Sequence, residues 1–352
     1  MGRVSQFDVA RSLGLTQQAV SYALSGRKAV SESTRRQVLS AAARLGYRPN
    51  IAARTMRSGH FGTVAVLVGT RWPVSHLPMP LLSGIEAALE RQGLRMLVTR
   101  VGDEKLTDPA YVPRILRELA ADGLLVTYNE CVPGRMMELV RQFRLPSIWV
   151  NARLPRDCVY PDDLSSARRA TEHLLAMGHR RIAYSHHAWS SADAAEGHYS
   201  VADRKAGCAA AMRQAGLTLL PGPVRRKGEG DDLDANLAAA LRRLSSSDRP
   251  TAAVCYCGTD ALALAIAAYR LGLSVPRDLS MIAFADSPDG FVLDKRLTTM
   301  VIPHEKVGTE AVNVLQARLD GRAHARRGIA IEATLAPGAT CGPPPRKGKG
   351  IY

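Results

Sequence analysis

The sequence predicts a small all-α N-terminal domain followed by a two-lobed α/β core built on parallel sheets. Residues 5–25 split at Gly14 into two short amphipathic helical patterns, and from Gly62 onward buried strand patterns alternate with helical ones. Such alternation is typical of parallel sheets that are covered by helices. With 352 residues, the chain is long enough for two or three domains with substantial cores.

Residues 5–25 predict two helices joined by a tight turn. Ser5 and Asp8 have the spacing of a capping box, Gly14 can adopt the left-handed conformation that ends a helix, and Thr16 can cap the second helix. The expected buried faces are Phe7, Val9, Ala10 and Leu13 in the first helix and Ala19, Val20, Ala23 and Leu24 in the second. Two such helices form a helix-turn-helix, and the alternative is an ordinary helical hairpin.

A third helix is predicted over residues 30–46, followed by Tyr47-Arg48-Pro49-Asn50 and a short helical run over 51–58. Ser31 or Ser33 caps this helix, and its core candidates are Val38, Leu39, Ala42 and Leu45. At this point the sequence resembles the lactose/galactose-repressor (LacI/GalR) family of bacterial transcription regulators. The matching residues are Asp8-Val9-Ala10, Gly14, Val20-Ser21, Val30-Ser31, Thr34-Arg35, Gly46 through Asn50, and Ala52.

Positive charge is concentrated at this end of the chain. The net charge of the protein is +15, and residues 1–60 hold ten lysines or arginines against Asp8 and Glu32, which gives this segment +8. Neutralisation of phosphates by such a segment would supply a salt-sensitive part of DNA affinity.

The composition indicates a cytoplasmic protein. No run of eighteen apolar residues predicts a membrane span, and the N-terminus has no signal-peptide pattern. The six cysteines are scattered and form no CxxC pair, so we expect buried free thiols and no metal site. Cys255 and Cys257 are expected to lie on one face of a strand.

The core elements follow from apolar runs and helical periodicity. Strands are expected at 63–68, 94–99, 123–127, 147–151, 181–185, 251–256, 279–284, 298–302 and 329–334. Helices are expected at 82–92, 111–121, 134–143, 164–177, 201–215, 233–244, 260–271 and 307–319.

The resemblance covers residues 4–336 and implies a core like the periplasmic sugar-binding proteins, in which the chain crosses between lobes three times. We expect crossings near Asp162, Phe291 and Gly321. The predicted domains are a helix-turn-helix domain at 1–46, a hinge helix and linker at 47–60, and the core at 61–340. Lobe 1 is expected to span about 61–161 and 291–320, and lobe 2 about 162–290 and 321–340, followed by a disordered basic tail at 341–352.

The second helix is predicted to read DNA bases. The resemblance implies that Gln17 and Gln18 contact bases, and glutamine can hydrogen-bond bidentately to adenine. Tyr22 occupies a position that is often arginine in the family, so the DNA site should differ there. The remaining polar candidates are phosphate contacts or helix caps, two roles that stay open: Ser5, Thr16, Ser21, Ser31 and Asn50.

Residues 50–58 resemble the family's hinge helix, which packs against its dimer mate in the minor groove. Met56 occupies the position where the family usually has a leucine wedge that opens a base step, and Ala53 is also assigned to DNA contact. The alternative for Met56 is packing against the lobe below. Because the segment is short, its order can depend on DNA and on the lobes.

Ligands of two-lobed α/β folds bind beyond the carboxyl ends of parallel strands. The effector candidates there are Trp72, Tyr128, Asn151, Trp189, Arg204, Thr259 and Asp286. Arg204 matches the family's sugar-hydroxyl clamp, and the alternative is a surface ion pair. For Trp72 and Trp189 two interpretations stay open: each stacks on the face of a sugar, or each belongs to the hydrophobic core. Ala285 replaces a carboxylate that the family often uses for sugar hydroxyls, so we expect a sugar or sugar acid, with preference for a carboxylated compound.

No catalytic motif, cofactor or metal site is predicted. A Rossmann-type dehydrogenase would need a glycine-rich turn after residues 63–68, and a secreted sugar-binding receptor would not carry residues 1–60. His186, His187 and His198 lack ligand spacing and are interpreted as a polar loop. The sequence therefore predicts a regulator, in the simplest case a repressor, that binds a palindromic operator as a homodimer and responds to a small polar effector.

Overall fold

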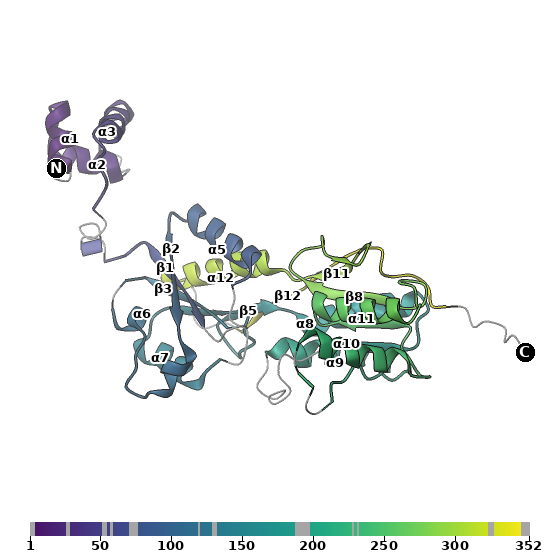
Figure 1. Cartoon of the computed structure of the whole chain (residues 1–352). Helices are drawn as coiled ribbons and strands as arrows, with labels where there is room; N and C mark the ends of the chain where they lie inside the picture. The colour runs from purple at the N-terminus through teal and green to yellow at the C-terminus, as the bar shows by residue number, and fades with distance from the viewer. Residues whose placement is uncertain are drawn as a thin grey trace, which may run out of the picture. The chain divides into compact units, whose positions relative to one another are not determined.

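The computed structural model describes residues 4–25, 29–50, 55–56, 59–69, 77–118, 120–128, 132–186, 198–226, 229–230, 232–322 and 327–345. The chain forms two compact units, Met1–Phe61 and Gly62–Tyr352 (Figure 1).

The first unit contains three helices, α1 (Gln6–Leu13), α2 (Gln17–Ser25) and α3 (Glu32–Arg44). Both halves of the predicted capping box are present at Ser5, and Gly14 ends α1 with a φ of 64°. The helices enclose a small core of valines and alanines: Val9, Ala10, Val20, Ala23, Val38, Ala41 and Ala42. The predicted helix-turn-helix arrangement is therefore confirmed.

Two predicted core residues of this unit are exposed. Phe7 is 53% exposed and its ring lies 4.7 Å from the guanidinium carbon of Arg11, while Leu39 is 47% exposed. The core of three short helices is narrow, and alanines fill much of it. Phe7 and Leu39 lie beside the buried positions and face outward.

The first lobe of the second unit is a six-stranded sheet in the order β12-β5-β4-β3-β1-β2. Its strands are β1 (Thr63–Gly69), β2 (Arg95–Val101), β3 (Gly123–Thr127), β4 (Ser147–Val150), β5 (Cys158–Pro161) and β12 (Ile329–Ile331). Helices α5 (Met79–Arg91) and α12 (His304–Leu319) pack side by side on one face (Figure 1). The 3-10 helix η1 (Asp103–Thr107), α6 (Arg114–Arg117) and α7 (Gly134–Phe143) cover the other.

The second lobe is a five-stranded sheet in the order β13-β11-β8-β7-β6. Its strands are β6 (Ile182–Ser185), β7 (Ala252–Cys255), β8 (Ser280–Ala285), β11 (Thr298–Val301) and β13 (Thr334–Ala336), and only β13 is antiparallel. One face packs on α8 (Asp163–Ala176) and α9 (Tyr199–Gln214), the other on α10 (Leu233–Leu244) and α11 (Gly258–Arg270). A hairpin of β9 (Phe291–Val292) and β10 (Lys295–Arg296) lies beside α11. The predicted parallel α/β core is confirmed.

Strand pairing corrects two predicted crossings between the lobes. β11 pairs with β8 in the second lobe, while α12 packs on the first, so the second crossing lies at Ile302–Pro303 and not near Phe291. The third crossing separates β12 from β13, because one predicted strand at 329–334 is in fact two strands in different sheets. The boundaries 291–320 and 321–340 are wrong for this reason.

Local predictions failed at three further places. The helix expected at 111–121 is reduced to Arg114–Arg117, because Pro113 cannot lie inside a helix and Glu118 is already extended. Strand β5 was not predicted. Cys257 is not on a strand face, since it is the N-cap of α11 and its backbone N–H donates to Asp260.

The start of the predicted disordered tail is also ordered. Residues 341–345 follow the edge of the second lobe, where the Gly342 N–H donates to the Ser280 hydroxyl at 3.0 Å. The buried His179 ring bridges Thr251 and the Gly342 carbonyl, each at 2.9 Å. Hydrogen bonds to the core hold this segment in spite of its Gly-Pro composition.

Candidate functional site

Helix α2 carries the polar side chains that were predicted to read bases. Gln17 and Gln18 are exposed, and Ser21 and Tyr22 are half-buried. The Gln18 amide donates to the Tyr22 hydroxyl at 2.8 Å, across one helical turn. This contact fixes the two side chains relative to each other, so Tyr22 helps to orient a predicted base contact.

Three of the hydroxyls that were left open between phosphate contact and cap act as caps, while Ser21 lies inside α2. Ser5 Oγ accepts from the Asp8 N–H at 3.3 Å, Thr16 Oγ1 from the Ala19 N–H at 3.2 Å, and Ser31 Oγ from the Thr34 N–H at 3.2 Å. Each cap fixes a helix start, where free N–H groups also favour anions.

Of the three predicted DNA contacts in the hinge segment, the structure describes Asn50 and Met56. Asn50 is exposed after α3, and Met56 has 89% of its surface exposed. Ala53 lies outside the described residues. A methionine this exposed is available for an apolar contact with another molecule.

Arg204 is the centre of a buried polar network in the second lobe. Its Nε donates to Asp163 Oδ1 at 2.6 Å, and its Nη1 donates to the Tyr256 carbonyl at 2.7 Å. The guanidinium lies over the rings of Phe284 and Tyr256, with its carbon 3.9 Å and 4.6 Å from their centres. The side chains of Arg204 and Asp163 are 6% and 2% exposed, so the surface ion pair that was the alternative for Arg204 is in fact a buried one.

The charge state of this pair follows from its surroundings. Burial lowers the pKa of the Arg204 guanidinium, but the Asp163 carboxylate together with Tyr256 and Tyr184 raises that pKa above its ordinary value. Arg204 therefore remains charged and paired.

His198 links the network to the first lobe. Its Nε2 lies 2.7 Å from the Asn151 carbonyl and its Nδ1 lies 2.8 Å from Ser200 Oγ, which in turn lies 3.0 Å from the Tyr256 hydroxyl. Asn151 has a left-handed φ of 58°, which turns the chain at the end of β4. Burial lowers the pKa of His198, so the ring bridges the lobes in its neutral form.

The other predicted effector residues divide into two groups. Asp286 follows β8, and its Oδ1 lies 3.2 Å from Nε2 of His304, which interacts electrostatically with His198. Tyr128 is buried in the first lobe with its hydroxyl 3.3 Å from Asp103, and Thr259 is exposed in the first turn of α11. Trp72 and Trp189 lie outside the described residues. Asn151, Arg204 and Asp286 are thus brought together, and no described contact joins Tyr128 or Thr259 to them.

Five members of the network were missed as site residues: Asp163, His198, Ser200, Tyr256 and His304. Asp163 follows the predicted crossing between the lobes at Asp162, and Tyr256 is the last residue of a predicted strand. These two positions could have marked them as site residues. Their partners are distant in sequence, and this hid their role.

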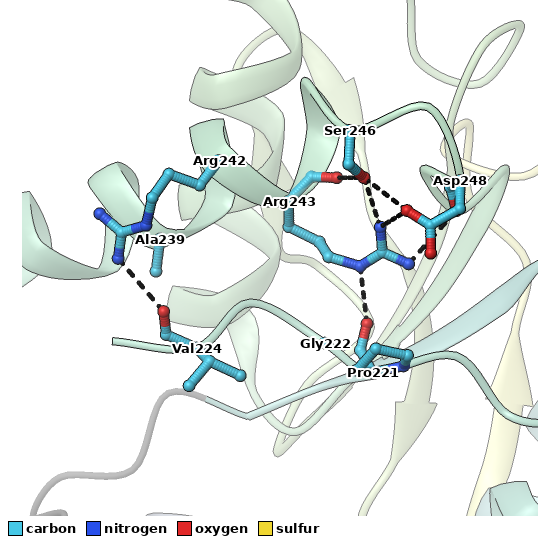
Figure 2. Close-up of a pocket in the computed structure, with 8 residues that line it drawn as sticks. All are labelled: Pro221, Gly222, Val224, Ala239, Arg242, Arg243, Ser246 and Asp248. Atoms are coloured by element: carbon cyan, nitrogen blue, oxygen red, sulfur yellow. Dashed lines mark hydrogen bonds and ion pairs between the residues drawn. The ribbon is translucent and has the colours of Figure 1, made fainter. Parts of the chain in front are cut away.

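A surface groove of about 360 Å³ lies elsewhere, between α10 and the chain at 221–224 (Figure 2). Its two arginines are engaged: Arg243 donates to the Pro221 carbonyl and pairs with Asp248, and Arg242 pairs with Glu229. None of its lining residues belongs to the Arg204 network.

The part of the chain that the structure describes holds no cluster of histidine, cysteine or carboxylate side chains suited to a metal ion. Among the same residues, no helix is both long and apolar enough to span a membrane.

Comparisons with known proteins find a matching family model within each of the two compact units. The model of the bacterial regulatory proteins of the lacI family matches residues 7–50, and that of the periplasmic binding protein-like domain matches residues 171–341. The HTH-type transcriptional repressors PurR of Vibrio vulnificus and Photobacterium profundum are 28% and 26% identical, over 91% of this chain and 93% of each relative.

The fold is similar to that of solved repressors. The Lac repressor dimer bound to operator and the anti-inducer ONPF superposes with a TM-score of 0.74 at 21% identity, covering 96% of this chain and 99% of that one. A LacI family regulator from Mycobacterium smegmatis has a TM-score of 0.61 at 25% identity, over 80% and 99% of the two chains. The chain thus carries a helix-turn-helix domain of the lacI family of bacterial regulatory proteins, followed by a two-lobed core with a periplasmic binding protein-like domain.

Proposed function

We propose that this protein is a cytoplasmic transcriptional repressor that binds an inverted-repeat DNA site as a homodimer and responds to a small polar effector. The observation that carries the proposal is α2, a capped second helix with Gln17 and Gln18 exposed, within a segment of net charge +8. A recognition helix of this kind reads bases from its first exposed side chains.

Exposed apolar side chains support the homodimer. β2 is an edge strand of its sheet and exposes Leu97 and Val98, and in the second lobe Tyr269 and Phe291 are 75% and 65% exposed. One helix reads only a few base pairs, so two-fold pairing supplies the specificity that one chain lacks.

The Arg204 network supports effector binding between the lobes. Asn151 belongs to the first lobe, Arg204 and Asp286 to the second, and His198 connects the two. A ligand that touches both lobes can bind one arrangement of them more tightly, and this difference is the coupling to DNA affinity, commonly about 1–3 kcal/mol. We propose a hydroxylated compound of the sugar class as the effector.

Selection of binding sites from a random pool of duplex DNA tests this function. We expect an inverted repeat, and substitution of Gln17 or Gln18 with alanine should alter the preferred bases within each half-site. Serine substituted for exposed Ala43 of α3 serves as a control that leaves the preference unchanged. Recovery of no repeat would favour a receptor module without DNA-directed regulation.

Met56→Ala is expected to weaken specific DNA binding by about 1–3 kcal/mol and to reduce DNA bending, because an apolar wedge is lost. Met56 is 89% exposed, so the stability of the free protein should hardly change. Gel mobility of circularly permuted DNA measures the bend. Met79→Ala, at a residue 67% exposed on α5, is the matched control. Unchanged bending with Met56→Ala would show that Met56 is no wedge.

A further inference from the structure

We propose that Asp163 is a specificity-determining residue: by neutralising Arg204, it makes the effector site select an uncharged ligand over an anionic one. The inference rests on the proposed effector role of the Arg204 network. It reverses the preference for a carboxylated compound, which the sequence suggested because Ala285 replaces a carboxylate, since Asp163 places another carboxylate beside Arg204.

The first step is the geometry of the pair. Arg204 Nε and Asp163 Oδ1 are 2.6 Å apart, and both side chains are at most 6% exposed. A charge pair at this distance away from water cancels most of its own field, so little positive potential remains for a ligand anion. Asp286, whose Oδ1 lies 3.2 Å from His304 Nε2, adds a second carboxylate to the network.

The second step is that Asp163 does not cap its helix. Asp163 is the first residue of α8, but the cap of that helix is Asp162, whose Oδ1 accepts from the Ser165 N–H at 3.0 Å. The second oxygen of Asp163, Oδ2, is buried and has no hydrogen-bond partner among the described residues. The nearby Tyr199 hydroxyl donates to the Pro161 carbonyl at 3.1 Å.

The third step is what the pair leaves for a ligand. Nε and Nη1 of Arg204 are engaged by Asp163 and Tyr256, and no described residue accepts a hydrogen bond from Nη2. One N–H of Nη1 and both N–H groups of Nη2 remain, and they can donate to hydroxyl or carbonyl oxygens. A ligand carboxylate at this guanidinium would lie close to the Asp163 carboxylate, where like charges repel.

The test uses the full chain and an isosteric change, Asp163→Asn, which keeps the shape and removes the negative charge. Thermal unfolding is followed with D-galactose and with sodium D-galacturonate, and with sodium phosphate against sodium chloride at equal ionic strength. We expect no anion-specific stabilisation of the wild type. In Asp163→Asn, galacturonate and phosphate should bind about tenfold or more tightly than in the wild type, because an unpaired buried cation recruits an anion. The double variant Asp163→Asn/Arg204→Gln should lose this gain.

Two results would overturn the proposal. One is anion-specific stabilisation of the wild type that the double variant lacks, and the other is a folded Asp163→Asn variant that gains no anion affinity. If Asp163→Asn does not fold, the comparison of the wild type with the double variant, which carries neither charge, decides: equal and weak anion responses support the proposal. Operator binding by the unliganded wild type is measured separately, so its failure would count against the proposed function and not against this selectivity.

Discussion

Arg204→Ala is expected to lower the free energy of unfolding by about 3–5 kcal/mol, because it leaves the Asp163 carboxylate buried without its partner. Arg204 Nε lies 2.6 Å from Asp163 Oδ1, and both side chains are almost fully buried. The guanidinium also packs on the Phe284 ring and donates to the Tyr256 carbonyl. Denaturant titration followed by circular dichroism measures the change. The loss combines an unpaired charge with lost packing, and both act in the same direction.

Arg168→Ala is the matched control for this prediction. Arg168 forms an ion pair with Glu172 at 3.7 Å, and the two side chains are 50% and 45% exposed. Water screens such a pair, so the expected cost is about 0–1 kcal/mol. Equal losses for the two arginines would contradict the role assigned to the buried pair. The contrast also matters for function, because a lost effector response in Arg204→Ala alone would not separate a lost contact from lost stability.

Features that depend on neighbouring residues could be predicted from the sequence. The Ser5 capping box, the left-handed Gly14 and the Thr16 cap each involve residues within three or four positions. Helices α7 and α10 span the same residues, 134–143 and 233–244, that the helical spacing of their apolar side chains predicted. The helix-turn-helix and its candidate base contacts were therefore accessible without coordinates.

Features that depend on distant pairing could not be predicted. The apolar run at 329–334 reads as one strand, yet its halves pair with β5 and β11 in different sheets. Arg204 was recognised as a site residue, but its partner Asp163 lies 41 positions away, and only the packing of α8 on α9 brings them together. In our proposal this partner sets the charge preference of the ligand, and the sequence pointed to Arg204 without revealing the carboxylate beside it.

Gly84→Ala is expected to lower the free energy of unfolding by about 1–3 kcal/mol, because α5 and α12 cross with their backbones in contact. A Cβ on Gly84 would overlap the Glu305 carbonyl, which is backbone and cannot rotate away. On the other helix, a Cβ on Gly308 would lie 2.5 Å from the Leu81 carbonyl oxygen, so Gly308→Ala should cost a similar amount. Gly134→Ala is the control, since nothing lies within 4 Å of its Cβ position at the start of α7.

The double variant Gly84→Ala/Gly308→Ala separates crowding at one crossing from two unrelated defects. Both added methyl groups push the same two helices apart, so the separation that accommodates the first makes room for the second. The combined loss should therefore be smaller than the sum of the single losses, since residues that share one contact couple. Denaturant titration of the four proteins measures the coupling. Strictly additive losses, or a Gly84→Ala variant as stable as Gly134→Ala, would contradict a close crossing of α5 and α12.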